Sequence, residues 1–352
     1  MAYTTIDDPT IFFNTLLYTG DANSSTQRTV GFQPNWSWIK ARNQAYDHRL
    51  QDSVRGGTQS LDANTTDSEA TFSTGQVFNS TGFTIGDAGL GNESSTTYVS
   101  WNWKAGTSFS NDASATSIGS IDSSGSVNET AGFSICTYTG VSSAGTIKHG
   151  LSTVPSMIIW KNRSASNGWI VYHHKNTSAP ETDYLELHST NSTTDLNTIM
   201  NDTAPTSSVF SIGTEGAVGG SNTNNFVAYI FSERKGYSKF GSYVGNGSAS
   251  GTYVHLGFKP AWLLIKPIAT ASWRIWDNKR EDYVGNANQT TLNANESDGE
   301  YDNSSVAIDF LSNGFKGRSS NSDISGSGVS YIYMAFAESP FVNSNGVPNN
   351  AV

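Results

Sequence analysis

The chain of 352 residues carries one sequence pattern three times, and this repeat constrains its fold more than any other feature. The clearest copy is Gly31-Phe-Gln-Pro-Asn-Trp-Ser-Trp-Ile-Lys40, which returns at residues 257–266 and, more loosely, at 150–161. The tyrosine of a Tyr-x-Gly motif precedes each Pro by 16 or 17 residues, and an alternating apolar segment closes each copy. Anchors in one order, spread over roughly 100 residues, predict three similar structural units in tandem.

The segments within each copy have the patterns of β-strands. In the first closing segment, Val99, Trp101 and Trp103 fall on one face, which predicts a half-buried strand of defined register. The Pro-anchored segment is apolar on both faces in the second and third copies, so we expect a central strand covered on each side. Short strands separated by turns predict an all-β fold of three tandem β-sandwich units, jelly-roll-like in form. A six-bladed propeller with two blades per copy is the alternative.

The composition favours a folded β protein over a disordered chain. Charged residues make up 14% of the chain, below the roughly 25% of soluble domains, yet there are 9 Trp, 15 Tyr and 17 Phe. The formal net charge is −10 without a basic stripe, so we expect no nucleic-acid partner. Cys136 is the only cysteine, which excludes an intrachain disulfide, and it is expected to be a small buried residue on a strand.

The repeat divides the chain into six predicted segments. The start of the chain lacks the basic and apolar regions of a signal peptide, and no apolar run approaches the ~20 residues that span a membrane. We therefore expect synthesis in a cytoplasm and no membrane insertion. The predicted segments are an N-terminal docking segment (1–12), a first β unit (13–106), a Ser/Gly-rich linker (107–132), second and third β units (133–235 and 236–341) and a polar tail (342–352).

The histidines do not form a recognisable metal or catalytic motif. His149 and His255 both precede the Pro-anchored strand of their copies, and this equivalence predicts a structural role. The adjacent His173 and His174 could be half of a metal site, but no carboxylate or further histidine completes it at a recognisable spacing. We interpret this pair as surface or cross-strand histidines.

Two carboxylates could in principle serve a glycosidase, which needs a pair flanking the sugar bond. Asp52 and Asp277 occupy the same place in the first and third copies, and each has an Arg three residues later. The second copy lacks both charges, so a local Asp–Arg pair that closes a turn is the favoured interpretation. The sequence accordingly predicts no catalytic residues, no cofactor and no enzyme activity.

Two further features bear on ligand binding. Residues 293–304 include four acidic side chains, but without the Asp-x-Asp-x-Asp-Gly framework of a calcium loop. A solvated loop is therefore favoured, and no metal site is predicted. Exposed Tyr or Trp side chains at loop tips could stack on sugar faces, but the sequence assigns no residue to this role. The acidic residues of the loop are Glu296, Asp298, Glu300 and Asp302.

Several longer segments resemble the virion structural, tail-fibre-like proteins of marine tailed bacteriophages. The resemblance extends from Tyr3 to Val347 and implies a location on the virion surface, after synthesis in the host cytoplasm. It carries no catalytic residues over to this chain. The resembling segments are Asp52-Ser-Val-Arg-Gly56, Thr81-Gly-Phe-Thr-Ile-Gly86, Tyr98-Val-Ser-Trp-Asn-Trp-Lys-Ala-Gly106, the stretch from Gly236 to Gly247, Asp309-Phe-Leu-Ser-Asn-Gly-Phe315 and the stretch from Tyr331 to Phe341.

These observations lead to one functional hypothesis with two alternatives. We expect a non-catalytic tail fibre or receptor-binding appendage that acts in adhesion to the host surface. The first alternative is a capsid decoration or head-fibre (knob) protein, and the second is a polysaccharide-degrading tailspike. Tailspikes are usually β-helices with repeats of roughly 20–30 residues, far shorter than those of this chain. The expected partners are other virion proteins, a host cell-surface glycan or protein, and further copies of the chain, as a trimer if it forms a fibre.

Overall fold

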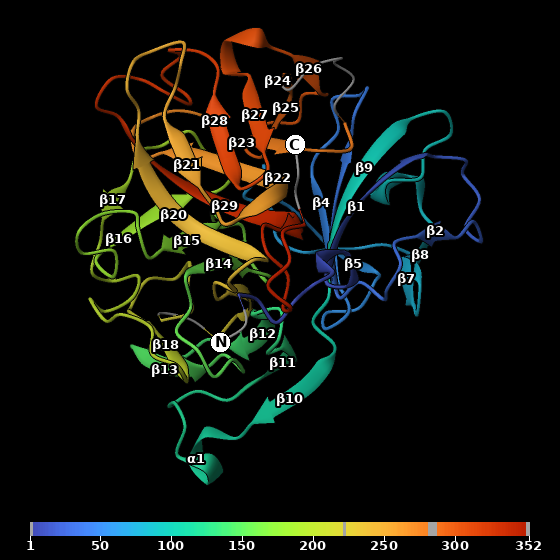
Figure 1. Ribbon diagram of the computed structural model, residues 1–352. Coiled ribbons are helices and arrows are strands. Elements are labelled where there is room, and N and C mark those ends of the chain that lie inside the picture. The colour runs from blue at the N-terminus through green and yellow to red at the C-terminus, as the bar shows by residue number, and fades with distance from the viewer. Residues whose placement is uncertain (1–2, 221–222, 281–286, 350–352) are drawn as a thin grey trace.

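The computed structural model describes residues 3–220, 223–280 and 287–349, and its regular structure is almost entirely β (Figure 1). The all-β prediction is therefore confirmed. The few helices in the described part of the chain are no longer than four residues. They are η1 (Pro9–Ile11), η2 (Ala88–Leu90), α1 (Ala113–Thr116) and η3 (Ser304–Val306).

The first part of the chain, blue in Figure 1, forms a six-stranded sheet with a three-stranded sheet on its outer face. The strand orders are β1-β9-β3-β4-β5-β6 and β2-β8-β7. Ile39, Phe83 and Tyr98 belong to the hydrophobic cluster between the two sheets. The strands are β1 (Phe13–Thr19), β2 (Arg28–Thr29), β3 (Trp36–Ala41), β4 (Arg49–Asp52), β5 (Gln59–Asp62), β6 (Ala70–Thr71), β7 (Gln76–Asn79), β8 (Gly82–Ile85) and β9 (Thr97–Trp103).

The middle part of the chain forms an eight-stranded sheet and a two-stranded sheet, with orders β10-β11-β12-β19-β14-β15-β16-β17 and β13-β18. Ile147, Trp160 and Phe210 belong to the cluster between these sheets. The strands are β10 (Thr107–Asn111), β11 (Ser123–Asn128), β12 (Phe133–Thr139), β13 (Gly145–Lys148), β14 (Met157–Asn162), β15 (Ile170–His173), β16 (Asp183–Glu186), β17 (Thr194–Asp195), β18 (Val209–Ile212) and β19 (Asn225–Phe231).

The last part, orange to red in Figure 1, forms a six-stranded sheet and a four-stranded sheet. Their orders are β20-β29-β22-β23-β25-β26 and β21-β28-β27-β24, with Val254, Leu263 and Phe315 in the cluster between them. The strands are β20 (Ser238–Val244), β21 (Tyr253–His255), β22 (Phe258–Pro267), β23 (Arg274–Asp277), β24 (Ala287–Asn288), β25 (Thr290–Asn293), β26 (Tyr301–Asp302), β27 (Ile308–Leu311), β28 (Gly314–Gly317) and β29 (Ser330–Pro340).

The segment 107–132, predicted from its composition to be a Ser/Gly-rich linker, instead contains two strands of the second large sheet. Its strands β10 and β11 pair with each other, and β11 extends the second large sheet by pairing with β12 from Phe133 to Tyr138. Strand ladders are made by backbone groups, so small polar side chains do not prevent them. The packing also needs a small residue, because a Cβ on Gly125 would lie 1.9 Å from the carbonyl oxygen of Ile135.

The three large sheets share one strand order. In each, the first strand of a copy pairs with the closing strand, which pairs with the Pro-anchored strand. This Pro-anchored strand is buried on both faces, as predicted. The Tyr-x-Gly tyrosine stacks on the first aromatic residue of the closing strand in every case. The stacked pairs and their ring-centroid distances are Tyr18–Tyr98 (5.2 Å), Tyr138–Phe226 (5.3 Å) and Tyr243–Tyr331 (4.8 Å).

The inner faces of the three large sheets meet in one hydrophobic cluster, which we call the shared core. Trp36 of the first large sheet stacks on Tyr229 of the second, with ring centroids 4.3 Å apart. Trp103 meets Trp262 of the third large sheet at 5.7 Å. The closing-strand residues that the period-two pattern assigned to one face all lie in this cluster. The molecule therefore has one core common to the three large sheets and a separate core under each small sheet.

Polar contacts join the large sheets in a ring. A carbonyl group in β5, β16 or β25 meets a ring nitrogen from the next large sheet, and the third sheet returns to the first. The contacts are Asp62 O with Trp169 Nε1 (2.8 Å), Glu186 O with Trp273 Nε1 (2.8 Å) and Asn293 O with His48 Nε2 (3.0 Å). Each sheet is thus held by both of its neighbours.

The described residues of both terminal segments pack against the third part of the chain or each other. Ile6 is buried in the shared core, and Tyr3 donates a hydrogen bond to the carbonyl of Gly257 at 2.8 Å. In the tail, the hydroxyl of Ser344 donates to the Asp7 carboxylate at 2.5 Å. The predicted docking segment is therefore largely engaged within the fold from residue 3 onward, while residues 1–2 and 350–352 lie outside the described residues.

Candidate functional site

The lysine that ends each repeated Gly-to-Lys motif is buried and donates to backbone carbonyl groups. Lys40 Nζ reaches Ser297 O of the third part of the chain at 2.9 Å, and Lys161 Nζ reaches Thr66 O of the first at 2.8 Å. Burial lowers the pKa of these ammonium groups, and that of Lys266, to about 8. Lys40 and Lys161 thus join two parts of the chain, whereas Lys266 donates to the nearby carbonyl groups of Pro267 and Ala269. The motif contains all three lysines, but the sequence did not reveal these roles.

The two carboxylates considered for a glycosidase are fully buried. Asp52 Oδ2 lies 2.5 Å from Arg55 Nε, and Asp277 Oδ2 lies 2.6 Å from Arg280 Nε. The interpretation as local Asp–Arg pairs is therefore confirmed. Because a polysaccharide cannot reach a carboxylate that is sealed inside the core, these residues do not form a glycosidase pair.

The same position of the repeat holds His173 in the second large sheet. Each of these three side chains also contacts the next large sheet: Asp52 accepts from Tyr229 OH (2.8 Å), Asp277 accepts from Trp101 Nε1 (3.0 Å), and His173 Nε2 meets Tyr333 O (3.1 Å). His173 is fully buried, so the surface setting predicted for it is wrong, whereas the cross-strand alternative agrees with its place on β15 opposite Met157. Burial lowers its pKa to about 3.

The adjacent His174 is partly buried and also contacts the third large sheet. Its Nε2 lies 2.8 Å from the carbonyl oxygen of Phe240, and burial lowers its pKa. The histidine pair thus bridges two sheets. Within the described residues, no group of three or more His, Cys, Asp or Glu side chains is placed to hold a metal ion.

His149 and His255 do not occupy equivalent positions. The strand that precedes each Pro-anchored strand pairs with the strand that carries the repeated Phe. Counted from the residue opposite this Phe, His149 corresponds to Leu256, and His255 corresponds to Lys148. A one-residue offset in a strand places side chains on opposite faces. His149 is fully buried and contacts Thr206 O at 3.1 Å, whereas His255 is exposed. The predicted structural role is confirmed for His149 only.

The acidic loop at residues 293–304 is solvated only in part, because Asp298 and Asp302 are exposed whereas Glu300 packs against the first part of the chain. Both carboxylate oxygens of Glu300 accept from Arg42 Nε, at 2.8 and 2.9 Å. Glu296 accepts from Asn293 and Ser272. The loop therefore stabilises the contact between the third and first sheets.

Cys136 lies on β12 and is fully buried, as predicted, and burial raises the pKa of its thiol to about 12. All nine tryptophans are buried as well, so none of them is available to stack on a sugar. Tyr46 and Tyr253 are the large aromatic side chains with high exposure in the described chain, at 41% and 44%.

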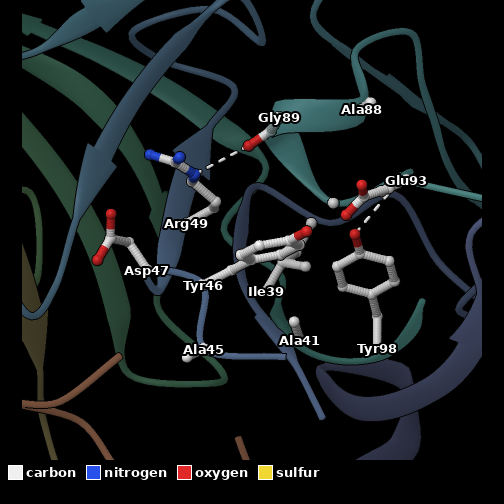
Figure 2. Close-up of a pocket in the computed structure, with 11 residues that line it drawn as sticks. Ile39, Ala41, Ala45, Tyr46, Asp47, Arg49, Ala88, Gly89, Glu93 and Tyr98 are labelled. Carbon is white, nitrogen blue, oxygen red and sulfur yellow. Dashed lines mark hydrogen bonds between the residues drawn. The ribbon is translucent and has the colours of Figure 1, made fainter. Parts of the chain in front are cut away.

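Tyr46 borders a surface cavity of about 340 Å³, which we call the Tyr46 pocket. Figure 2 shows its ring lying across Ile39, with its hydroxyl end directed toward Glu93. The floor comes from β3, one wall from η2 and the residues after it, and the other from the start of β4. The lining residues that matter below are Ile39, Tyr46, Asp47, Arg49, Glu93 and Tyr98.

The charges in the Tyr46 pocket are held in fixed positions. Arg49 donates from Nη1 to both oxygens of Asp62 at 2.6 Å and from Nε to the carbonyl of Gly89 at 2.9 Å. Interaction with the Glu93 carboxylate raises the pKa of Tyr46. A preformed pocket with an aromatic wall and a few oriented polar groups is typical of small-ligand sites.

The corresponding corners of the other two large sheets have different chemistry. By strand register, Arg49 corresponds to Ile170 in the second and to Arg274 in the third. The guanidinium of Arg274 is engaged by Asp323, at 3.0 Å from Nε, and by the hydroxyl of Tyr301. The Tyr46 pocket is therefore a specialisation of the first part of the chain.

The sequence of the chain matches the model of one known protein family. Residues 8–340 match the model of a family described as a domain of unknown function (DUF7483). The chain belongs to this family. No curated protein and no solved structure matched the chain. The family match runs through all three large sheets, in agreement with a core to which all three contribute. No helix in the described ranges is long and apolar enough to cross a bilayer.

Proposed function

We propose that the chain is a non-catalytic surface protein of a bacteriophage particle, either a tail fibre or a receptor-binding appendage, that binds host saccharides through the Tyr46 pocket. The phage location comes from the sequence resemblance. The adhesive role is supported by one structural observation, the exposed Tyr46 ring at the edge of a preformed pocket.

The chemistry of the pocket suits a sugar. An exposed aromatic ring offers an apolar face, and carboxylate and guanidinium groups can exchange hydrogen bonds with several hydroxyl groups. Glu93 and Asp47 are only partly buried, so a ligand can reach them. Asp62 and Gly89 hold Arg49 in place through its Nη1 and Nε atoms, so its guanidinium has a fixed orientation at the pocket.

We further propose that the three parts of the chain are tandem β-sandwich units, jelly-roll-like in form and derived from one ancestral unit. The common strand order, the repeated lysines and the repeated tyrosine stacks support this proposal. Such a chain would attach to other virion proteins, and a fibre would require it to form a trimer.

The binding proposal is tested with purified host surface polysaccharide on a biosensor. Tyr46→Ala removes the ring and should abolish or reduce binding by at least ~10-fold, whereas Tyr46→Phe keeps the ring and should retain most of it. Thermal melting of both variants serves as the folding control. Equal binding by wild type and Tyr46→Ala would exclude this pocket as the site, and release of reducing sugar ends would overturn the non-catalytic role.

The location is tested by cryo-electron microscopy of intact particles. Density for this chain at the tail supports the proposal. Density placed regularly over the capsid would identify a decoration or head-fibre protein and would refute the receptor-binding role.

A further inference from the structure

A second surface cavity, of about 560 Å³, lies beside β20, the edge strand of the third large sheet. We call it the β20 pocket. It is formed by β20, β21 and the residues that follow β15, so it lies where the second and third large sheets meet. Its polar and aromatic lining includes Lys175, Glu233, Lys239, Tyr253, His255 and Tyr333.

The β20 pocket is locally basic in an acidic protein. Lys175 and Lys239 contribute two ammonium groups against the single carboxylate of Glu233, in a chain whose formal net charge is −10. Lys239 Nζ donates to the carbonyl of His255 at 2.7 Å, which holds this ammonium at the pocket. Lys175 is exposed and can turn toward a ligand. Two cations at one cavity favour a negatively charged ligand.

The same cavity has an aromatic wall in a defined orientation. Tyr253 is 44% exposed, and its hydroxyl donates to Asn313 Oδ1 at 2.6 Å, which fixes the ring at the rim. Opposite, Tyr333 lies over Gly241, where a Cβ would be 2.3 Å from the Tyr333 hydroxyl. A glycine at position 241 is therefore required for this tyrosine to reach the pocket. The ring of Tyr253 offers a flat apolar surface next to the cations.

We propose that the β20 pocket binds an anionic sugar, a uronic acid or a sugar phosphate, with the acidic group between Lys175 and Lys239 and the sugar ring against Tyr253. It is a separate site from the Tyr46 pocket, whose lining carries the carboxylates of Asp47 and Glu93 and would repel the same ligand. The inference does not depend on the proposed role of the Tyr46 pocket.

Ligand-observed NMR titrations of the full chain with D-glucuronate, glucose 6-phosphate and D-glucose test this inference. We expect the anionic sugars to bind more tightly than glucose, and more weakly as salt is raised. The double variant Lys175→Gln/Lys239→Gln should weaken anionic-sugar binding by at least ~10-fold, because two charge-assisted hydrogen bonds are lost. Tyr253→Ala should weaken binding of all three sugars.

Matched variants separate the two pockets. Lys104→Gln, a lysine outside both cavities, and Tyr46→Ala should leave binding of the anionic sugars unchanged. Binding of glucuronate alone or of glucose 6-phosphate alone would support the site and identify its anion as carboxylate or phosphate. Equal affinity for glucose and the anionic sugars, no binding of either anionic sugar, or normal binding by the double lysine variant would overturn the inference.

Discussion

Asp52 and Asp277 show how this protein keeps charges in its interior. Each carboxylate is paired with an arginine three residues later and also bonded to an aromatic side chain of a neighbouring large sheet. At the same position in the second large sheet, His173 contacts a backbone carbonyl group of the third sheet in place of such a charged pair. The position therefore requires a polar contact between sheets, while the identity of the residue is free to vary.

Removing one partner of such a pair should be costly. In Asp277→Asn, the buried Arg280 would lose its nearer carboxylate and keep only that of Glu300, 3.5 Å from its Nη1, and we expect the free energy of unfolding to fall by about 3 kcal/mol. Urea unfolding followed by tryptophan fluorescence measures this. Arg318→Gln breaks a pair whose arginine is 52% exposed and should cost less than about 1 kcal/mol. Similar losses in the two variants would contradict the assignment.

His149 should make stability depend on pH. Burial lowers its pKa to about 4, whereas the unfolded chain has a value near ~6.5. Between these values the unfolded chain binds a proton that the folded protein does not. The contribution of His149 to stability is therefore complete above about pH 6.5 and decreases by about 3 kcal/mol as pH falls to 4.

His149→Leu isolates this contribution, because the position that matches it by strand register in the last part of the chain is Leu256. The variant should be less stable than wild type at pH 7, where it lacks the contact with Thr206, and this deficit should shrink toward pH 4. Guanidinium unfolding at several pH values gives the difference. His255→Leu, at an exposed position, is the control, and an unchanged deficit at pH 4 would refute the prediction.

At the scale of elements, the β10–β11 hairpin depends on a small side chain where it joins the second large sheet. A Cβ on Gly125 would collide with the backbone of β12, so Gly125→Ala should detach β11 from the sheet edge. We expect faster hydrogen exchange in the amides of β12 by at least ~10-fold, measured by mass spectrometry. Ser124→Ala, whose side chain is exposed on the same strand, should leave exchange nearly unchanged.

The sequence predicted the elements whose side chains alternate and missed those held by backbone pairing. Val99, Trp101 and Trp103 were placed on the correct face because burial imposes period two on a strand. The hairpin was missed because its ladder needs no apolar pattern. His255 was misassigned because similarity of spacing does not fix register to one residue.

The candidate binding sites could not be predicted from the sequence for a related reason. Tyr46 is one of 15 tyrosines, and only packing distinguishes it from Tyr18 or Tyr98, whose rings stack on each other. The repeated lysines were visible in the motif, but the carbonyl groups that they contact, such as Ser297 O for Lys40, are far away in the sequence. Such contacts are set by how the sheets meet.

At the scale of the whole molecule, the shared core makes the three large sheets interdependent. A chain that ends at residue 235 would uncover parts of the inner faces of two sheets, including Trp101 and Trp103, which both contact Trp262, and we expect it not to fold. The full chain should unfold in a single transition, with equal calorimetric and van't Hoff enthalpies. Deletion of residues 342–352 should change the melting temperature little. A cooperative transition in the 1–235 fragment would contradict this view.

The ring of contacts between the sheets also sets an order of events during synthesis. The contact of His48 with Asn293 and that of Lys40 with Ser297 can form only after the second residue of each pair has been synthesised. These second residues follow 245 and 257 positions later in the chain. Until then, the tryptophan-rich inner faces of the early sheets have nothing to cover them except each other. Contacts this distant in sequence form slowly, and uncovered apolar faces attract chaperones or other nascent chains. The last third of the chain to be synthesised therefore completes the burial of apolar surface that the first two thirds cannot bury by themselves.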